Sequence, residues 1–355
     1  MPLPIEPVIP PGSSPAVSYV MPVLNEVDYL EAGLAGILNQ DFEGPIEIVL
    51  ALGPSNDGTN ELAARLAAGD PRIRLVDNPA MDIPTGLNVA IAASSGPVIV
   101  RVDAHSELPP NYTSLAIAAL ERTGAANVGG VMMARGKTPF QRMVARAYVS
   151  RFGLGGGQYH HEGSEGRPAE SAYLGVFRRS VLTEVGVYDT SLKRGEDWEL
   201  NLRIREAGHL VWYEPRMVVT YWPRSRWRDV GRQFFATGVW RGEVVRRHPT
   251  RNSIRYFAPP ALVAATTAAL AWAGVSATVP GVPGWPGLGL AIAPLSYLLA
   301  LVAVIASQRD VSLRERGMLT LIFPTMHVSW GLGFLRGCLF GAGNQVDRSR
   351  VSRRS

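Results

Sequence analysis

Two short acidic motifs carry residue types that could take part in chemistry on a charged ligand. Asp103-Ala104-His105 places a carboxylate and an imidazole two residues apart, and Glu196-Asp197 places two carboxylates side by side. Carboxylate and imidazole groups can hold the divalent cation with which a nucleoside diphosphate is bound. Each motif also has a purely structural explanation, because Asp103 could cap a turn beside an exposed His105. An acidic pair at the start of a helix stabilises it by roughly 0.5–1 kcal/mol without any ligand.

The elements that must position these motifs are short strands that alternate with helices along the first part of the chain. We expect strands at 17–23, 46–52, 73–76 and 98–102 and helices at 59–68, 85–93 and 196–207. This alternation predicts βαβ units on a parallel sheet, whose ligands bind at the carboxyl ends of the strands. The polar residues that follow these expected strands are Asn25, Glu26, Asp57, Asp103 and His105. We therefore expect a nucleotide to bind at this edge of the sheet.

The composition restricts the class of protein. The chain has 355 residues, which suggests two folded units at roughly 150 residues each. Hydrophobic residues make up 46% and charged residues 18%, so the chain is not of the disordered class. One cysteine, Cys338, excludes an internal disulfide framework and a cysteine-based metal site. Residues 1–14 lack the basic and apolar regions of a secretory signal, so we expect the N-terminal part to lie in the cytosol.

Residues 216–255 are strongly basic, with ten Arg against Asp229 and Glu243. Trp222, Trp227 and Trp240 lie among these arginines. A charge run is often only a solvated face, and nucleic-acid binding uses a similar composition. Because aromatic residues are interleaved and an apolar run follows, we expect an amphipathic helix on an anionic membrane surface and no nucleic-acid partner.

A long apolar stretch follows the basic segment. Asp, Glu, Lys and Arg are all absent from 256–307. Segments 257–279 and 288–307 are each long enough to cross a bilayer, and arginines flank both outer ends of this hairpin. A third segment, 317–335, contains Pro324 and His327 and could span the membrane, re-enter it or lie at its surface.

Five short motifs follow one another in a fixed order. They are Pro22-Val23-Leu24-Asn25-Glu26, Asn56-Asp57-Gly58-Thr59, Gly86-Leu87-Asn88, Asp103-Ala104-His105 and Gly195-Glu196-Asp197-Trp198-Glu199-Leu200. This series resembles the family-two inverting glycosyltransferases of GT-A fold, over about residues 16–250. The membrane-bound glucosyltransferases of succinoglycan-type exopolysaccharide assembly also have Asp-Ala-His in place of Asp-x-Asp. The resemblance implies an α/β fold, in which a Rossmann-like, nucleotide-sugar-binding mixed sheet is flanked by helices, with membrane helices at the C-terminal end.

The resemblance also implies a role for each matching residue. Asp197 would be the general base that deprotonates the acceptor hydroxyl, and Glu196 would shape the acceptor site. Asp103 and His105 would hold Mn²⁺ or Mg²⁺, and the cation would stabilise the leaving diphosphate. The residues that would bind the nucleotide sugar are Pro22, Glu26, Asp57, Asn88, Asp103, Gln233 and Trp240.

Three departures from the family pattern bear on specificity. Leu52-Gly53-Pro54 stands where the family usually has paired aspartates, one of which reads uracil, so the identity of the nucleobase stays open. Of the possible donors, a UDP-sugar is favoured and a GDP-sugar is possible. His105 in place of a carboxylate favours Mn²⁺ over Mg²⁺. Processive relatives have a Gln-x-x-Arg-Trp element, but after Gln233 this chain has Ala236 at the position of the Arg. The element is therefore incomplete, which favours transfer of a single sugar.

We therefore expect a multi-pass cell-membrane enzyme whose catalytic domain faces the cytoplasm and transfers one hexose to a lipid-linked glycan. Two alternatives are a processive polysaccharide synthase and a non-catalytic membrane scaffold on a degenerate transferase fold. The expected parts are a disordered segment 1–15, a GT-A catalytic domain 16–215, a basic interfacial segment 216–255, membrane helices 256–340 and a basic tail 341–355.

Overall fold

The computed structural model describes residues 8–14, 16–154, 165–249 and 254–343, so much of the expected segment 1–15 and tail 341–355 lies outside it. The chain forms two compact units. Of the described residues, the first unit comprises 8–14, 16–134 and 165–221, and the second comprises 135–154, 222–249 and 254–343. The described residues of the first unit form a β-sheet and helices, and the elements formed by those of the second unit are helices.

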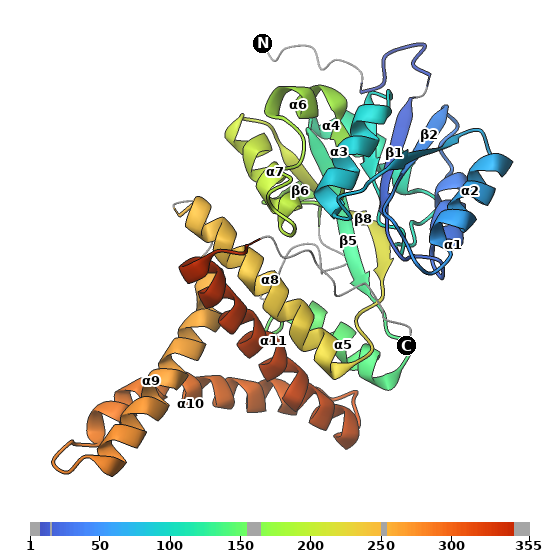
Figure 1. Ribbon diagram of the computed structural model, residues 1–355. Helices are drawn as coiled ribbons and strands as arrows, with labels where there is room; N and C mark the ends of the chain where they lie inside the picture. The colour runs from blue at the N-terminus through green and yellow to red at the C-terminus, as the bar shows by residue number, and fades with distance from the viewer. Residues whose placement is uncertain (1–7, 15, 155–164, 250–253, 344–355) are drawn as a thin grey trace. The chain divides into compact units, whose positions relative to one another are not determined.

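One mixed sheet forms the centre of the first unit (Figure 1). Its strand order is β3-β2-β1-β4-β7-β5-β8-β6. Its strands are β1 Val17–Val23, β2 Ile46–Leu52, β3 Ile73–Asp77, β4 Val98–Arg101, β5 Asn127–Ala134, β6 Arg167–Pro168, β7 Tyr173–Arg178 and β8 Val211–Tyr221. β1 to β4 are parallel, whereas β7 runs antiparallel to both β4 and β5. The carboxyl ends of β1 to β4 therefore meet at one edge, as the alternating pattern predicts.

Both faces of this sheet are buried under helices. The helices of the first unit are α1 Leu30–Leu38, α2 Thr59–Gly69, α3 Ile83–Ala93, α4 Tyr112–Thr123, α6 Arg179–Val185 and α7 Glu196–Glu206. Successive side chains of β1 enter different hydrophobic cores, Tyr19 on one face and Val20 on the other. Because β1 is covered on both faces, it reads in the sequence as a continuous apolar run.

Helices make up the described part of the second unit (Figure 1). They are α5 Pro139–Val149, α8 Trp227–Arg247, η2 Ile254–Phe257, α9 Ala258–Thr278, α10 Trp285–Ala306 and α11 Leu313–Phe340. α5 belongs with this unit although its residues fall inside the range 16–215 expected for the catalytic domain. It is fixed there because Tyr148 packs edge-on against Phe234 of α8, with ring centroids 5.7 Å apart.

α8 and α11 pack at backbone contact through glycines of both helices. A Cβ atom at Gly238 would collide with the carbonyl of Trp330, and one at Gly337 would collide with the carbonyl of Val239. Small residues four apart, such as Gly333 and Gly337, let two helix backbones approach in this way. The basic helix α8 is therefore buried along one side. The first residues of the expected basic segment 216–255, up to Tyr221, belong to strand β8 and not to this helix.

In the described part of the second unit, three helices are long and apolar enough to cross a membrane: Ile254–Thr278, Trp285–Ala306 and Leu313–Phe340. The apolar stretches of the first two have almost no buried residues, although Val263 of the first is buried, whereas 39% of the apolar stretch of the third is buried by other parts of the protein. The third segment is one continuous helix of 28 residues that runs through Pro324. A capping box between Ser312 and Glu315 begins it.

Candidate active site

A cluster of three carboxylates surrounds Arg101 in the first unit. Arg101 is the last residue of β4, and its Nη2 lies 3.4 Å from Oδ1 of Asp103 just beyond the strand end. Its Nη1 lies 3.2 Å from Oε1 of Glu196 and also donates a hydrogen bond to Oδ1 of Asp197. Glu196 and Asp197 open α7, where Gly195 adopts the left-handed conformation (φ 78°) that starts the helix. The end of β4 is thus joined to the first turn of α7.

Asp197 is the most accessible carboxylate of this cluster. Its side chain is 28% exposed, against 8% for Glu196 and 12% for Asp103. Desolvation by the surrounding protein raises the pKa of Asp197 to about 7, although Arg101 opposes the change; Glu196 and Asp103 add to the increase. A carboxylate that titrates near neutral pH and can be reached from outside is suited to accept a proton from a ligand.

A second group of polar residues lies at the ends of β1 and β2. Nδ1 of His105 is 3.2 Å from Oε1 of Glu26, and the backbone amide of Glu26 donates to the Thr59 hydroxyl. Asp57 accepts hydrogen bonds from the amide and hydroxyl of Thr59 and from the amide of Val27. Desolvation would raise the pKa of Asp57, but these hydrogen bonds hold it below its usual value. Asp57 therefore fixes the loop after β1 against the start of α2.

The other predicted site residues lie in different surroundings. Pro22 belongs to β1, and Asn88 of α3 exchanges two hydrogen bonds with the backbone of Tyr188. Gln233 and Trp240 lie on α8 in the second unit. Gln233 accepts a hydrogen bond from the Tyr148 hydroxyl at 3.3 Å, and Trp240 is only 4% exposed. Membership of the site stays a prediction for these four residues.

Arg101 is a site residue that the sequence analysis missed. It lies in the apolar run Val98-Ile99-Val100-Arg101-Val102, and its side chain is 5% exposed. A buried arginine almost always has a charged partner, so an isolated Arg in a buried strand was a usable signal. The ring of Tyr188 adds a further contact, since its centroid is 5.8 Å from the guanidinium carbon.

The charges of this site suit a divalent cation. Three carboxylates share the single positive charge of Arg101, which leaves an excess of negative charge beside Asp103 and His105. Among the residues that the structure describes, no group of three or more His, Cys, Asp or Glu side chains could hold a metal by itself. Asp103 and His105 offer two ligands, one oxygen and one nitrogen, so a phosphate-bearing ligand would have to supply others.

Comparison with known proteins identifies the family. The family model described as "Glycosyl transferase family 2" matches residues 18–186. The succinoglycan biosynthesis protein ExoA of Rhizobium meliloti (strain 1021) is 30% identical over 332 residues, which cover 90% of this chain and 94% of that protein. The chain belongs to glycosyl transferase family 2. This confirms the predicted family and makes the protein a glycosyltransferase.

A solved structure agrees with the fold of this glycosyltransferase, and a second sequence relative is more distant. The mannosyltransferase PcManGT from Pyrobaculum calidifontis, solved in complex with GDP-Man and Mn²⁺, superposes with a TM-score of 0.59 at 20% identity, covering 93% of this chain and 88% of that one. A dolichyl N-acetyl-alpha-D-glucosaminyl phosphate 3-beta-D-2,3-diacetamido-2,3-dideoxy-beta-D-glucuronosyltransferase of Methanococcus voltae is 22% identical over 65% of this chain and 74% of that protein. The predicted GT-A fold, a mixed sheet flanked by helices, is confirmed.

Proposed function

We propose that this glycosyltransferase is a membrane-bound inverting enzyme that transfers a single hexose from a nucleotide sugar to a lipid-linked glycan during polysaccharide or glycolipid assembly. The observation that carries the proposal is the exposed Asp197, whose pKa is raised to about 7, joined through Arg101 to the strand end at Asp103. The relative named for succinoglycan biosynthesis and the relative named for a dolichyl-linked acceptor support a glycan acceptor on a lipid.

Each site residue has a place in this reaction. Asp197 accepts the proton of the acceptor hydroxyl while the hydroxyl oxygen attacks the anomeric carbon. The bond from that carbon to the nucleoside diphosphate breaks on the opposite face, which inverts the configuration. Glu196 lies next to it in the first turn of α7 and shapes the acceptor side. Asp57 holds the loop that carries Glu26. Pro22, Glu26 and Asn88 of the first unit bind the donor.

Asp103 and His105 are the proposed ligands of a divalent cation, Mn²⁺ or Mg²⁺. When bound, the cation would neutralise charge that develops on the leaving diphosphate. The excess of carboxylates around Arg101 supports a cation at this place. The relative that was solved with GDP-Man and Mn²⁺ supports use of a nucleotide sugar with a cation, and a UDP-sugar remains the favoured donor here.

The proposed location is the cell membrane, with the catalytic unit in the cytoplasm. α9 and α10 have exposed apolar surfaces, for example Leu270 (70% exposed) and Leu299 (72% exposed). Arg309 and Arg314 follow the hairpin and Arg255 precedes it, which by the positive-inside rule supports a cytoplasmic location for both outer ends. Exposed arginines of α5 and α8 would then face anionic lipid headgroups.

The test is nucleotide release by detergent-solubilised protein from a panel of UDP- and GDP-sugars, each with Mn²⁺, Mg²⁺ or chelator. We expect cation-dependent release from one donor class, lost in Asp197→Asn and retained in Asp310→Asn, whose side chain is 88% exposed. Full release by Asp197→Asn would refute the assigned base. Transfer to a water-soluble sugar at the same rate as to a polyprenyl-linked glycan would refute the lipid-linked acceptor.

A further inference from the structure

Arg101 is a buried cation that donates hydrogen bonds to three carboxylates, those of Asp103, Glu196 and Asp197. Removing one partner of a buried ion pair is strongly destabilising, whereas replacing a whole pair by apolar residues is often neutral. A buried arginine with three carboxylates is therefore poorly explained by stability alone. It calls for a functional explanation.

The two nitrogens at the end of the guanidinium reach in different directions. Nη2 lies beside Asp103 at the end of β4, the donor side of the proposed reaction. Nη1 lies beside Glu196 and Asp197 in the first turn of α7, the acceptor side. The planar guanidinium can bridge both sides at once, which a lysine ammonium on a flexible stem does not do with the same geometry.

Two other arginines of the same unit show how a purely structural arginine is bound. Arg178 donates to the carbonyl oxygens of Ala125 and Leu120. Arg179 donates to the carbonyl of Gly96 at 2.6 Å and to that of Ile91 at 3.3 Å. These contacts satisfy backbone oxygens near helix ends, whereas those of Arg101 join carboxylates of two separate motifs.

We propose that Arg101 is a positioning residue that holds the carboxylate of Asp197 at a set place relative to the strand end that carries Asp103. The inference rests on the proposed function, because it assigns the acceptor side to Asp197 and the donor side to Asp103. Two consequences of opposite sign follow. Without Arg101 the base loses its fixed position, so turnover falls. At the same time Asp103 loses a positive neighbour 3.4 Å away, so a divalent cation binds more tightly.

The experiment uses the full chain in lipid nanodiscs with the donor found by nucleotide release, and compares Arg101→Met, Arg101→Lys and the control Arg179→Met. Binding of Mn²⁺ is measured from the electron paramagnetic resonance signal of the free ion, with the nucleoside diphosphate of that donor present to supply the remaining ligands and a protein-free sample as the blank. We expect Arg101→Met to bind Mn²⁺ at least about tenfold more tightly. Its kcat should fall by about 100-fold with little change in the KM of the donor, since a displaced catalytic group costs about that much.

Arg101→Lys keeps the positive charge but lacks the planar guanidinium. It therefore tests whether bridging both sides matters, even if Arg101→Met does not fold. We expect its Mn²⁺ affinity to stay near that of the wild type and its kcat to fall by roughly tenfold. Arg179→Met should lower the melting temperature and leave both quantities unchanged.

Three results would overturn the inference: a wild-type kcat in folded Arg101→Met, a wild-type kcat in Arg101→Lys, or Mn²⁺ affinity and kcat that fall together. If Asp197→Asn is inactive in the same assay, such a result refutes only the role of Arg101. If Asp197→Asn is fully active, the proposed function itself fails.

Discussion

Arg101 at the end of β4 donates a hydrogen bond to Asp197 in the first turn of α7, a residue 96 positions later in the chain. Asp197 keeps 28% of its side chain exposed in spite of this ion pair. The arrangement leaves a carboxylate that is both held in place and open to a ligand. The pH dependence of the enzyme follows from it.

The transfer rate should fall below about pH 7. The pKa of Asp197 is raised to about 7, so its carboxylate is charged above that pH and protonated, and therefore unable to accept a proton, below it. We expect kcat/KM to decrease about tenfold per pH unit on the acidic side, measured between pH 5 and 9. An acidic limb near pH 4 would show that a carboxylate with an ordinary pKa is the base.

His105 should determine the cation preference. We expect His105→Ala to weaken Mn²⁺ binding by about tenfold or more and to affect Mg²⁺ less, because imidazole suits Mn²⁺ better than Mg²⁺. His105→Asp should shift activity toward Mg²⁺. Activity titrated with each cation measures this preference. His209→Ala is the control, since His209 pairs with Glu184 at 2.9 Å outside the candidate site. Equal cation curves for wild type and His105→Ala would remove His105 from the ligand set.

The glycine contacts between α8 and α11 should make the second unit sensitive to a single methyl group. Gly337→Ala places a Cβ against the carbonyl of Val239, so we expect a loss of about 1–3 kcal/mol in stability. Gly317→Ala is the matched control on the same helix, because nothing lies within 4 Å of its added Cβ. It should be neutral or stabilising by about 0.5–1 kcal/mol. Thermal unfolding in detergent distinguishes the two, and equal melting temperatures would contradict the close packing.

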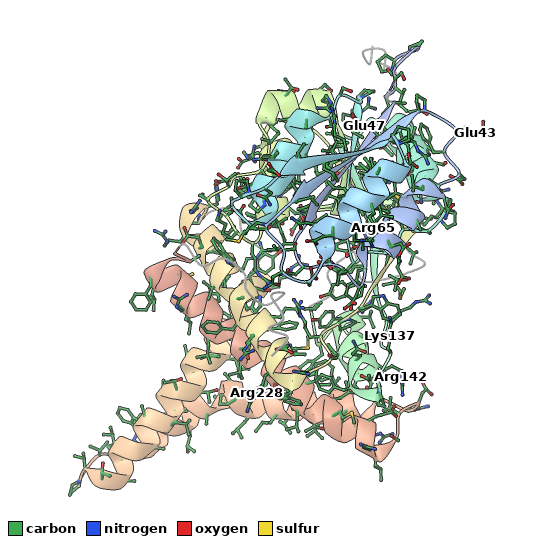
Figure 2. The ribbon with its side chains drawn as sticks, turned by 45° about the vertical axis from the view of Figure 1, so that its right-hand side comes forward. Glu43, Glu47, Arg65, Lys137, Arg142 and Arg228 are labelled. Carbon is green, nitrogen blue, oxygen red and sulfur yellow. The ribbon has the colours of Figure 1, made fainter. Side chains whose placement is uncertain are left out.

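Exposed arginines of the second unit should make the protein more stable in anionic lipid. Figure 2 labels Arg142 on α5 and Arg228 on α8, and both are exposed. Each arginine near a membrane surface contributes about 1 kcal/mol with anionic lipid. We expect Arg142→Glu with Arg228→Glu to remove most of the gain in melting temperature between zwitterionic and anionic nanodiscs.

Arg65→Glu is the matched control for this lipid effect, because Arg65 is an exposed arginine of α2 in the first unit (Figure 2). It should keep the full gain in anionic lipid. The gain should also weaken with added salt, which screens exposed charges. A double variant that keeps the gain would show that these arginines do not face the lipid.

Much of the first unit could be predicted because its signals are local. Apolar runs bounded by proline and glycine give β1 Val17–Val23 and β2 Ile46–Leu52 as the structure has them, and β4 ends one residue earlier than expected. The five motifs identify the family, since their residue types and order occur within short stretches of the chain. Hydropathy alone likewise indicates the apolar helices α9 and α10, because helices of that length need no distant partner to be recognised.

Only the tertiary structure decided which distant residues meet. The antiparallel insertion of β7 between β4 and β5, the grouping of α5 with α8 and α11, and the ion pairs of Arg101 all join segments far apart in the sequence. A residue type and its neighbours carry the information for a strand, a turn or a motif. The partner of a buried charge depends on packing between elements. The local sequence Val98-Ile99-Val100-Arg101 therefore does not predict that Arg101 pairs with Asp197.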